Sequence, residues 1–381
     1  MSLFSFTKKN SNKYSLVFNI GSGSVSGGII KFTEKVGENV IYFTKENIPF
    51  QQEVSVPRHL DLMKSTLITL ANKIQTEGIK KLITKNKNKI SFDRVFYIFS
   101  SPWCISQTKT IRVKESKPFK VTESYLNKII DEQEHKFQAE IAGFGSIIEK
   151  KIIQIKANGY IVNDINNKTI KDLEISVFFT VVPEKILNVI EKAVSKTFNI
   201  NNVWCHSFPL AAFSVIRNLF PQNEDFIFMD ISEEITDISI IKDNIIVSNA
   251  SIPLGRNHFV RNLSRVLKVS KEIADSMIKI HCAKDHDQLA SLRLSMSMDD
   301  AAKEWLNKIF ETLDSLKNEI YVPESIFLIT TSDLIPFLKE KLEKHDFSVL
   351  LINNNKVKST VAVDDLIFKL ELMFLDNIYK I

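Results

Sequence analysis

Short apolar runs joined by tight turns make up much of the chain and predict β-strands. Residues 14–20 and 25–32 are rich in apolar side chains and flank a glycine turn at 21–24, which predicts a β-hairpin. A similar pair of runs, at residues 226–231 and 236–242, recurs about 210 residues further along the chain. Because the same strand-turn-strand pattern is used twice, we expect two related lobes.

Apolar positions three or four residues apart predict helices between these strands. In residues 57–77, the side chains of Leu60, Met63, Leu67 and Leu70 fall on one face of such a helix. Further helices are predicted over 183–198, in a segment ending before Pro221, over 258–267, 271–281, 299–319 and 334–344, and from about 364 onward. Further strands are predicted over 40–48, 94–99, 325–329 and 347–352.

The pattern changes between about residues 102 and 180, where short strands surround a helix predicted to begin at Thr122. We expect an inserted α+β subdomain over 102–180. The predicted organisation is therefore a flexible tail at 1–13, a first lobe formed by 14–101 and 181–222, the inserted subdomain, and a second lobe at 223–381.

The composition is that of a globular protein, with 44% hydrophobic and 25% charged residues. The net charge of +5 comes from basic and acidic residues spread along the chain, so no nucleic-acid partner is expected. Cys104, Cys205 and Cys282 are far apart, which is typical of free thiols in the reducing cytoplasm. No run approaches the ~20 apolar residues of a membrane span, so we expect no direct span.

Four segments carry a resemblance. Residues 19–25 read Asn-Ile-Gly-Ser-Gly-Ser-Val, and residues 230–237 read Asp-Ile-Ser-Glu-Glu-Ile-Thr-Asp; residues 252–257 and 327–332 follow in the same order. In order and spacing they resemble the two phosphate motifs, the segment after the second, and the adenosine motif of the actin-like ATPase superfamily, in particular its FtsA and PilM branch. The resemblance covers nearly the whole chain. It implies a two-lobed α/β, actin-like (ribonuclease H-like) fold with duplicated lobes and a small inserted subdomain.

The resemblance also implies a nucleotide cleft formed by three turns. The residues it assigns there are Asn19, Gly21, Ser22, Gly23, Ser24, Asp230, Ser232, Glu233, Glu234, Thr236, Asp237, Gly255, Thr330, Thr331 and Ser332. Such turns need glycine, because backbone N–H groups must approach phosphate closely and a Cβ obstructs them. The second turn has Ser232, Glu233 and Glu234 in place of glycines, and the third turn has none either. Two of the three turns therefore lack the shape that binds a nucleotide.

The carboxylates of the second turn also disfavour nucleotide binding, because a carboxylate about 5 Å from a phosphate charge costs roughly 3 kcal/mol at an effective dielectric of 20. Asn19 also replaces the acid that the motif normally has. We therefore expect no cofactor, with binding of ATP and magnesium weakened. One alternative is a magnesium ion held by Asp230 and Asp237, with Glu233 or Glu234 joining Asp230 as a ligand. Another is that Asn19 and the two aspartates only bond the local backbone.

Together these features favour a non-hydrolysing scaffold over an enzyme. In this hypothesis the protein is cytoplasmic and peripheral at the inner face of the cell membrane, where the inserted subdomain and cleft bind a short peptide of a membrane-anchored pilus, division or filament protein. Self-association stays open. The C-terminal segment from about residue 364 has an apolar face but an excess of acidic residues, which favours packing into the second lobe over lipid binding. The alternatives are an active, ATP-binding FtsA-like cytoskeletal ATPase or polymer and, less favoured, a small-molecule kinase of the same fold.

Overall fold

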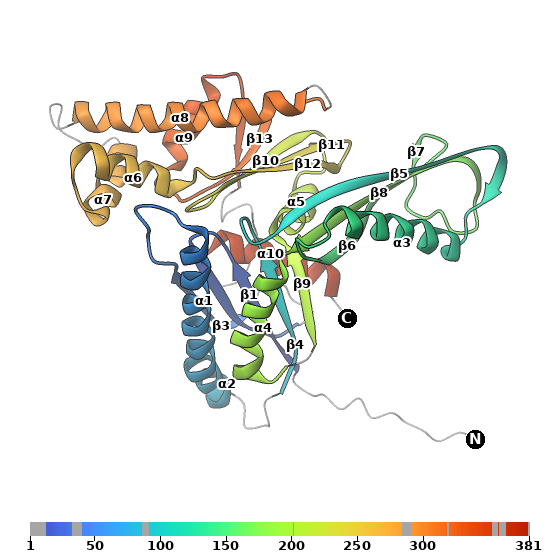
Figure 1. The fold of residues 1–381 in the computed structure, drawn as a ribbon, viewed down its shortest axis with the longest axis horizontal. Coiled ribbons are helices and arrows are strands. Elements are labelled where there is room, and N and C mark those ends of the chain that lie inside the picture. The colour runs from blue at the N-terminus through green and yellow to red at the C-terminus, as the bar shows by residue number, and fades with distance from the viewer. Residues whose placement is uncertain are drawn as a thin grey trace.

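The computed structural model describes residues 13–32, 40–85, 91–200, 202–283, 291–317, 320–352, 357 and 363–379. The tail predicted at 1–13 lies outside these residues except for Lys13, which begins the first strand. Three sheets account for the strands in the described residues, and two of these sheets have the same topology (Figure 1). The two-lobed α/β fold with duplicated lobes and an inserted subdomain is thereby confirmed.

The first sheet has the strand order β3-β2-β1-β4-β9. Its strands are β1 (Lys13–Ile20), β2 (Ser24–Ile30), β3 (Val40–Asn47), β4 (Ser91–Phe99) and β9 (Val203–Ser207). One face is covered by α1 (Val56–Lys73), which continues through a π-helical turn (Ile74–Gly78) into α2 (Ile79–Lys85), and by α4 (Glu184–Phe198). Alternate side chains of β1 serve the two faces, since Leu16 and Phe18 pack with α1 and α4 while Val17 packs on the other side.

The second sheet repeats this arrangement in the order β12-β11-β10-β13-β14. Its strands are β10 (Phe226–Ile231), β11 (Thr236–Lys242), β12 (Ile245–Ile252), β13 (Ser325–Ile329) and β14 (Ser348–Leu351). Its outer face packs against α6 (Arg256–Leu267), α7 (Lys271–Cys282), α8 (Ser291–Lys317) and α9 (Ile335–Glu343). In each sheet the first hairpin strand, β1 or β10, pairs antiparallel with the second hairpin strand and parallel with the strand on its other side, β4 or β13. This repetition is expected for a duplicated unit.

Two helices lie between the sheets. They are α5 (Phe208–Leu219) and α10 (Leu366–Tyr379), and their apolar side chains form one core with side chains from both sheets (Figure 1). The Phe368 ring of α10 lies 4.6 Å from the Phe43 ring of β3. The sequence placed the C-terminal helix in the second lobe, whereas α10 also packs against elements of the first lobe, including β3 and α5.

The third sheet, in the order β5-β8-β6-β7, projects from the side of the molecule with one helix on it (Figure 1). Its elements are β5 (Ile105–Lys120), α3 (Glu123–Glu140), β6 (Ser146–Ala157), β7 (Tyr160–Ile161) and β8 (Thr169–Val182). Thr122 caps α3 by accepting a hydrogen bond from the backbone N–H of Tyr125 at 3.2 Å. This sheet matches the range expected for the inserted subdomain except that β8 ends at Val182, and the exact limits at 102 and 180 remain a prediction.

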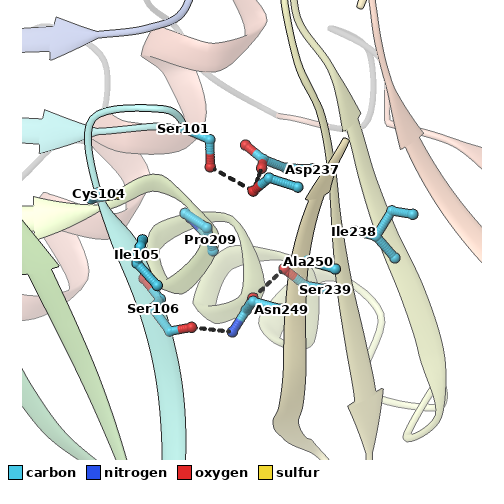
Figure 2. Close-up of a pocket in the computed structure, with 11 residues that line it drawn as sticks. Ser101, Cys104, Ile105, Ser106, Pro209, Asp237, Ile238, Ser239, Asn249 and Ala250 are labelled. Atoms are coloured by element: carbon cyan, nitrogen blue, oxygen red, sulfur yellow. Dashed lines mark hydrogen bonds between the residues drawn. The ribbon is translucent and has the colours of Figure 1, made fainter. Parts of the chain in front are cut away.

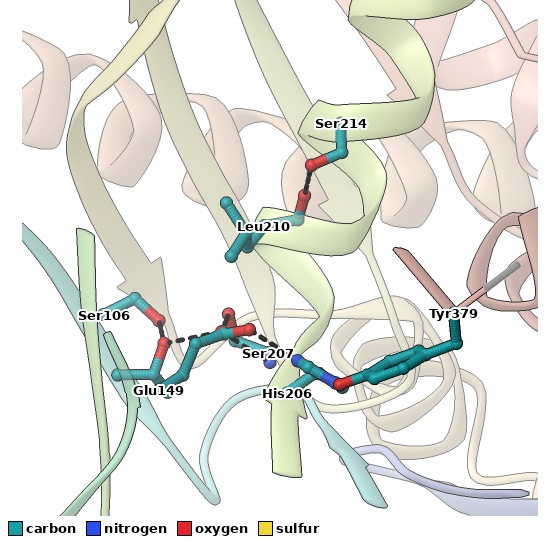
Figure 3. A network of polar contacts seen from close by, with 8 residues as sticks. Ser106, Glu149, His206, Ser207, Leu210, Ser214 and Tyr379 are labelled. Atoms are coloured by element: carbon teal, nitrogen blue, oxygen red, sulfur yellow. Dashed lines mark hydrogen bonds and ion pairs between the residues drawn. The ribbon is translucent and has the colours of Figure 1, made fainter. Parts of the chain in front are cut away.

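A buried polar network fastens this subdomain to the first lobe (Figure 3). The Glu149 carboxylate on β6 lies 2.7 Å from Nδ1 of His206 and accepts hydrogen bonds from the backbone and hydroxyl of Ser207 at 3.1 and 2.9 Å. Nε2 of His206 lies 3.0 Å from the hydroxyl of Tyr379 on α10. One buried carboxylate thus joins the inserted sheet, the first sheet and the C-terminal helix.

Candidate functional site

The two equivalent hairpin turns meet at the junction of the lobes. The hydroxyls of Ser22 and Ser232 are hydrogen-bonded at 2.7 Å, and the backbone N–H of Glu234 donates to Ser22 at 3.1 Å. Within the first turn, the Gly21 N–H donates to the Ser24 carbonyl at 3.0 Å. The residues assigned to the first two turns are therefore brought together, and they bond directly to one another.

The side chain of Glu233 lies against Gly23. A Cβ built on Gly23 would overlap the Cβ, Cγ and Cδ atoms of Glu233. Gly23 is thus required here by the close approach of a side chain from the second turn. The space immediately over the first turn is occupied by the chain itself.

The neighbouring Glu234 is neutralised by partners on α6. Its carboxylate forms an ion pair with Arg261 and accepts a hydrogen bond from the Asn257 amide at 2.7 Å. Gly255 lets this helix approach, because a Cβ there would overlap the Ser232 carbonyl oxygen. Sequence reasoning treated Glu234 as a free charge facing phosphate and missed Arg261, which lies 27 positions away.

Thr236 and Asp237, at the start of β11, are committed to structural contacts. Thr236 donates to the Leu254 carbonyl at 2.6 Å and accepts from the Trp305 indole at 2.9 Å. Asp237 accepts from Ser251 at 2.5 Å, and Ser251 in turn lies 2.9 Å from Ser101, at a small cavity of about 240 Å³ (Figure 2). Burial raises the pKa of Asp237, while hydrogen bonds from Ser251 and Ser101 oppose that rise.

Asp230 and Asn19 occupy the strand ends before the two turns, and the sequence missed the residue that faces them, Glu371 of α10. The amide of Asn19 donates to Oε1 of Glu371, which is fully buried. Oε2 of Glu371 and Oδ1 of Asp230 are buried without a hydrogen-bond partner among the described residues. Burial raises the pKa of both carboxyls well above the usual range, and the Asp230 carboxylate raises the pKa of Glu371 further. A charged residue inside the apolar run 366–375 was the available signal.

The predicted magnesium pair, Asp230 and Asp237, are cross-strand neighbours in the hairpin. Across the part of the chain that the structure describes, no group of three or more His, Cys, Asp or Glu side chains is arranged to hold a metal ion. The magnesium site therefore stays a prediction from the sequence.

The third turn closes on the same cleft and is fastened by an arginine that sequence reasoning missed. Thr330 donates to the Ile231 carbonyl at 3.1 Å, at the end of β10. Arg256 reaches Asp333 of this turn at 2.8 Å and Asp275 of α7 at 2.6 Å. A cavity of about 540 Å³ remains beside this bridge. Gly23, Glu233, Arg256, Lys271, Thr331 and Ser332 are among the residues that line it.

Comparison with known proteins identifies the class of fold. No family model matches the chain, and no curated protein matches its sequence. Solved structures do match, and the chain has the actin-like ATPase fold.

One solved structure, described as the PilM-PilN type IV pilus biogenesis complex, has a TM-score of 0.62 at 12% identity over 97% of this chain and 100% of that chain. Two others score lower: the ethanolamine utilization protein EutJ from Carboxydothermus hydrogenoformans, at 0.47, and a MamK double helical filament, at 0.45. Both have 10% identity and cover 96% and 97% of this chain, and 90% and 100% of the matched chains, respectively. The resemblance predicted from the motifs is confirmed at the level of the fold.

Proposed function

We propose that this protein is a non-hydrolysing actin-like scaffold that binds a short, extended peptide of a partner protein. The observation that carries the first half of this proposal is the Glu233 side chain lying against Gly23 between the two hairpin turns. In a phosphate-binding turn that space belongs to the phosphates, and backbone N–H groups point into it. A carboxylate there excludes phosphate both by volume and by charge.

The cross-links between the turns support the same conclusion. Ser22 bonds to Ser232, and Asn19 bonds to Glu371, so side chains hold contacts across the junction. Within the second lobe, Arg256 fastens the third turn by spanning Asp333 and Asp275. The residues present do not fit a nucleoside triphosphate with magnesium in this conformation, and we assign no chemical step to the cleft.

The peptide site that we propose is the outer edge of β6 in the inserted subdomain. β6 pairs with β8 along most of its length, but β7 pairs with it only at Lys156 and Ala157. Among the described strands no other ladder covers the edge from 151 to 154. An open strand edge of this kind accepts an extended peptide as an additional strand, with alternate side chains entering the adjoining groove.

A groove of about 560 Å³ follows this edge. Exposed Ile152 and Ile161 give it an apolar side, and Arg217 at the end of α5 lies across it. The Arg217 guanidinium stacks 5.1 Å from the Phe213 ring and makes no ion pair within the described chain. Burial lowers the pKa of Arg217, which reflects the cost of its unpaired charge. The groove therefore suits an extended peptide in which an apolar side chain is followed by an acidic one.

The burial of the C-terminal helix α10 bears on how the protein could attach to a membrane. No described helix is long and apolar enough to cross a membrane. The apolar side chains of α10 are packed between the sheets, so this helix does not offer a lipid-binding face. We therefore propose attachment to the cytoplasmic face of the membrane through an anchored partner in pilus assembly or cell division. The description of the PilM-PilN structure names a complex in type IV pilus biogenesis, which favours the pilus role.

One observation favours the alternative of an ATP-binding cytoskeletal protein. The cavity of about 540 Å³ beside Thr331 and Ser332 lies where the adenosine motif was predicted, with Lys271 on its wall. Arg256, which holds Asp275 and Asp333, lies on the wall of the same cavity.

We expect the purified protein to show negligible ATP hydrolysis, because Glu233 occupies the phosphate space. Phosphate release measured with ATP and magnesium, against a matched reaction containing a chelator, checks this. Magnesium-dependent turnover above about 1 per second, an ordinary enzyme rate, would overturn the scaffold assignment in favour of the alternative.

We expect peptides selected from a random displayed library on the full chain to carry an acidic residue beside an apolar one. The substitution Arg217→Gln should weaken their binding at least about tenfold, the scale of one buried charge-assisted contact. Arg112→Gln is the matched control, since Arg112 lies on β5 at the opposite edge of the same sheet. Equal affinity of both variants would place the peptide site elsewhere.

A further inference from the structure

A second apolar groove lies on the first lobe, away from the cleft and from the inserted subdomain. It encloses about 390 Å³ between α4 and the strands β4 and β9. Val95, Tyr97 and Phe99 form its floor, and Leu187 and Ile190 of α4 form one wall. In the described first sheet β9 is an edge strand that pairs only with β4, so the groove is open on that side.

This groove leaves apolar surface in contact with water. Val203 on its rim is 46% exposed. A contiguous apolar hollow bounded by an open strand edge is typical of a surface covered by another segment. The chain contains a segment with the matching chemistry.

We propose that Leu3, Phe4 and Phe6, in the segment before β1, occupy this groove. The segment reads Met-Ser-Leu-Phe-Ser-Phe-Thr-Lys-Lys, so three large apolar side chains are followed by two lysines. If these side chains cover the groove, the apolar surfaces of both are removed from water.

The starting point of the segment places it within reach. Lys13 begins β1 and pairs with Ser91, the first residue of β4. Val95, four residues further along β4, pairs with Val203 of β9 at the groove. Four strand residues span about 13 Å, and the twelve residues before Lys13 reach up to about 40 Å when extended. The apolar triad can therefore arrive in the groove of its own chain.

Charge and concentration both favour this occupant. Glu191 of α4 lines the groove, and Lys8 and Lys9 follow the apolar triad with the opposite sign. Tethering within one chain gives an effective concentration on the order of millimolar, well above that of a second molecule in dilute solution.

Cys205 lines the groove and supplies a direct test. In the full chain carrying Phe4→Cys, mild oxidation should form a disulfide within one chain, at a rate independent of protein concentration. Adding Leu3→Ser and Phe6→Ser should slow that reaction at least about tenfold if the segment docks in the groove. Random collision between the two thiols of one flexible chain would not depend on these apolar side chains. The same chain with Cys205→Ser is the blank. Disulfides between chains would show that a second copy occupies the groove, and equal rates with and without the anchors would show that nothing docks; either result overturns the proposal.

Hydrogen exchange gives an independent readout. Substituting Leu3, Phe4 and Phe6 by serine in the full chain should increase exchange at the backbone amides of α4 and β9 severalfold, while the amides of β10 and β11 stay unchanged as the internal control. A synthetic peptide of residues 1–12 added to that variant should restore protection. Unchanged exchange in a variant with native circular dichroism would overturn the proposal.

Discussion

Replacing Ser232 and Glu233 by glycine should give the protein measurable affinity for ATP, with a gain of about 100-fold over the unmodified chain. The Glu233 side chain fills the space over Gly23, and the Ser232 hydroxyl ties the two turns together. Removing a carboxylate about 5 Å from a phosphate relieves roughly 3 kcal/mol at an effective dielectric of 20, which is about two orders of magnitude in the dissociation constant. Calorimetry with ATP and magnesium on both proteins measures the change.

Glu234 must be retained in that variant, and it supplies the control. Its carboxylate is paired with Arg261 and Asn257, so replacing it by glycine leaves a partly buried guanidinium without its partner. A triple variant that also carries Glu234→Gly should therefore lose roughly 2–3 kcal/mol of unfolding free energy without a further gain in affinity. If the folded double variant binds no ATP, the contacts of Asn19 or Arg256, and not the second turn, close the cleft.

Most of the fold could be predicted because its strands are apolar and its helices have one apolar face. Apart from the two-residue β7, two strands were missed, and both for physical reasons. β9 is short and mixes Trp204 and Cys205 with the polar residues His206 and Ser207, whose side chains serve the network around Glu149. β12 carries polar residues such as Asn249 because it is an edge strand, and that side chain reaches Ser239 of the neighbouring strand.

Helix boundaries followed the apolar pattern less closely than strand boundaries. The helix α8 begins at Ser291, whereas the sequence predicted residue 299. The additional turns carry Leu294 and Met298, which are buried against the second sheet, at a spacing too short to be read alone as a helix. Tertiary packing stabilises these turns, and local pattern does not reveal it.

The site was predictable in its backbone and not in its side-chain contacts. The repeated hairpins indicated that the two turns would face each other, and they do. The side chains that bond to the turn residues are Glu371, Arg261 and Arg256. They come from helices whose rotation and register depend on the packing of the whole core. Spacing in the sequence carries no information about such contacts, so Asn19 appeared to be a lost acid when its amide in fact donates to Glu371.

The second large effect is expected in the pH dependence of stability, through Asp230 and Glu371. Burial raises the pKa of both carboxyls, and each is raised further by nearby acids: Asp237 and Glu233 act on Asp230, and Asp365 acts on Glu371. Lys45 opposes the rise at both groups. Their protons are bound more tightly in the folded than in the unfolded chain. The stability they contribute is therefore full below the unfolded pKa near 4 and is lost as the pH rises toward the folded pKa.

Neutral substitutions of the same shape should remove that loss. Glu371→Gln keeps an oxygen that accepts from Asn19, and Asp230→Asn removes a buried carboxyl whose Oδ1 lacks a partner among the described residues. Each variant should melt at a temperature at least roughly 2–4 °C higher than the unmodified chain at pH 8, the scale of about 1 kcal/mol in a domain of some 200 residues, and should differ little at pH 4. Asp300→Asn, at an exposed position of α8, is the control and should change neither value. Thermal unfolding followed by circular dichroism between pH 4 and pH 8 measures the effect. The prediction is wrong if the stability of a variant, relative to the unmodified chain, is lower at pH 8 than at pH 4. That result would show that these two carboxyls are ionised and stabilising in the folded protein.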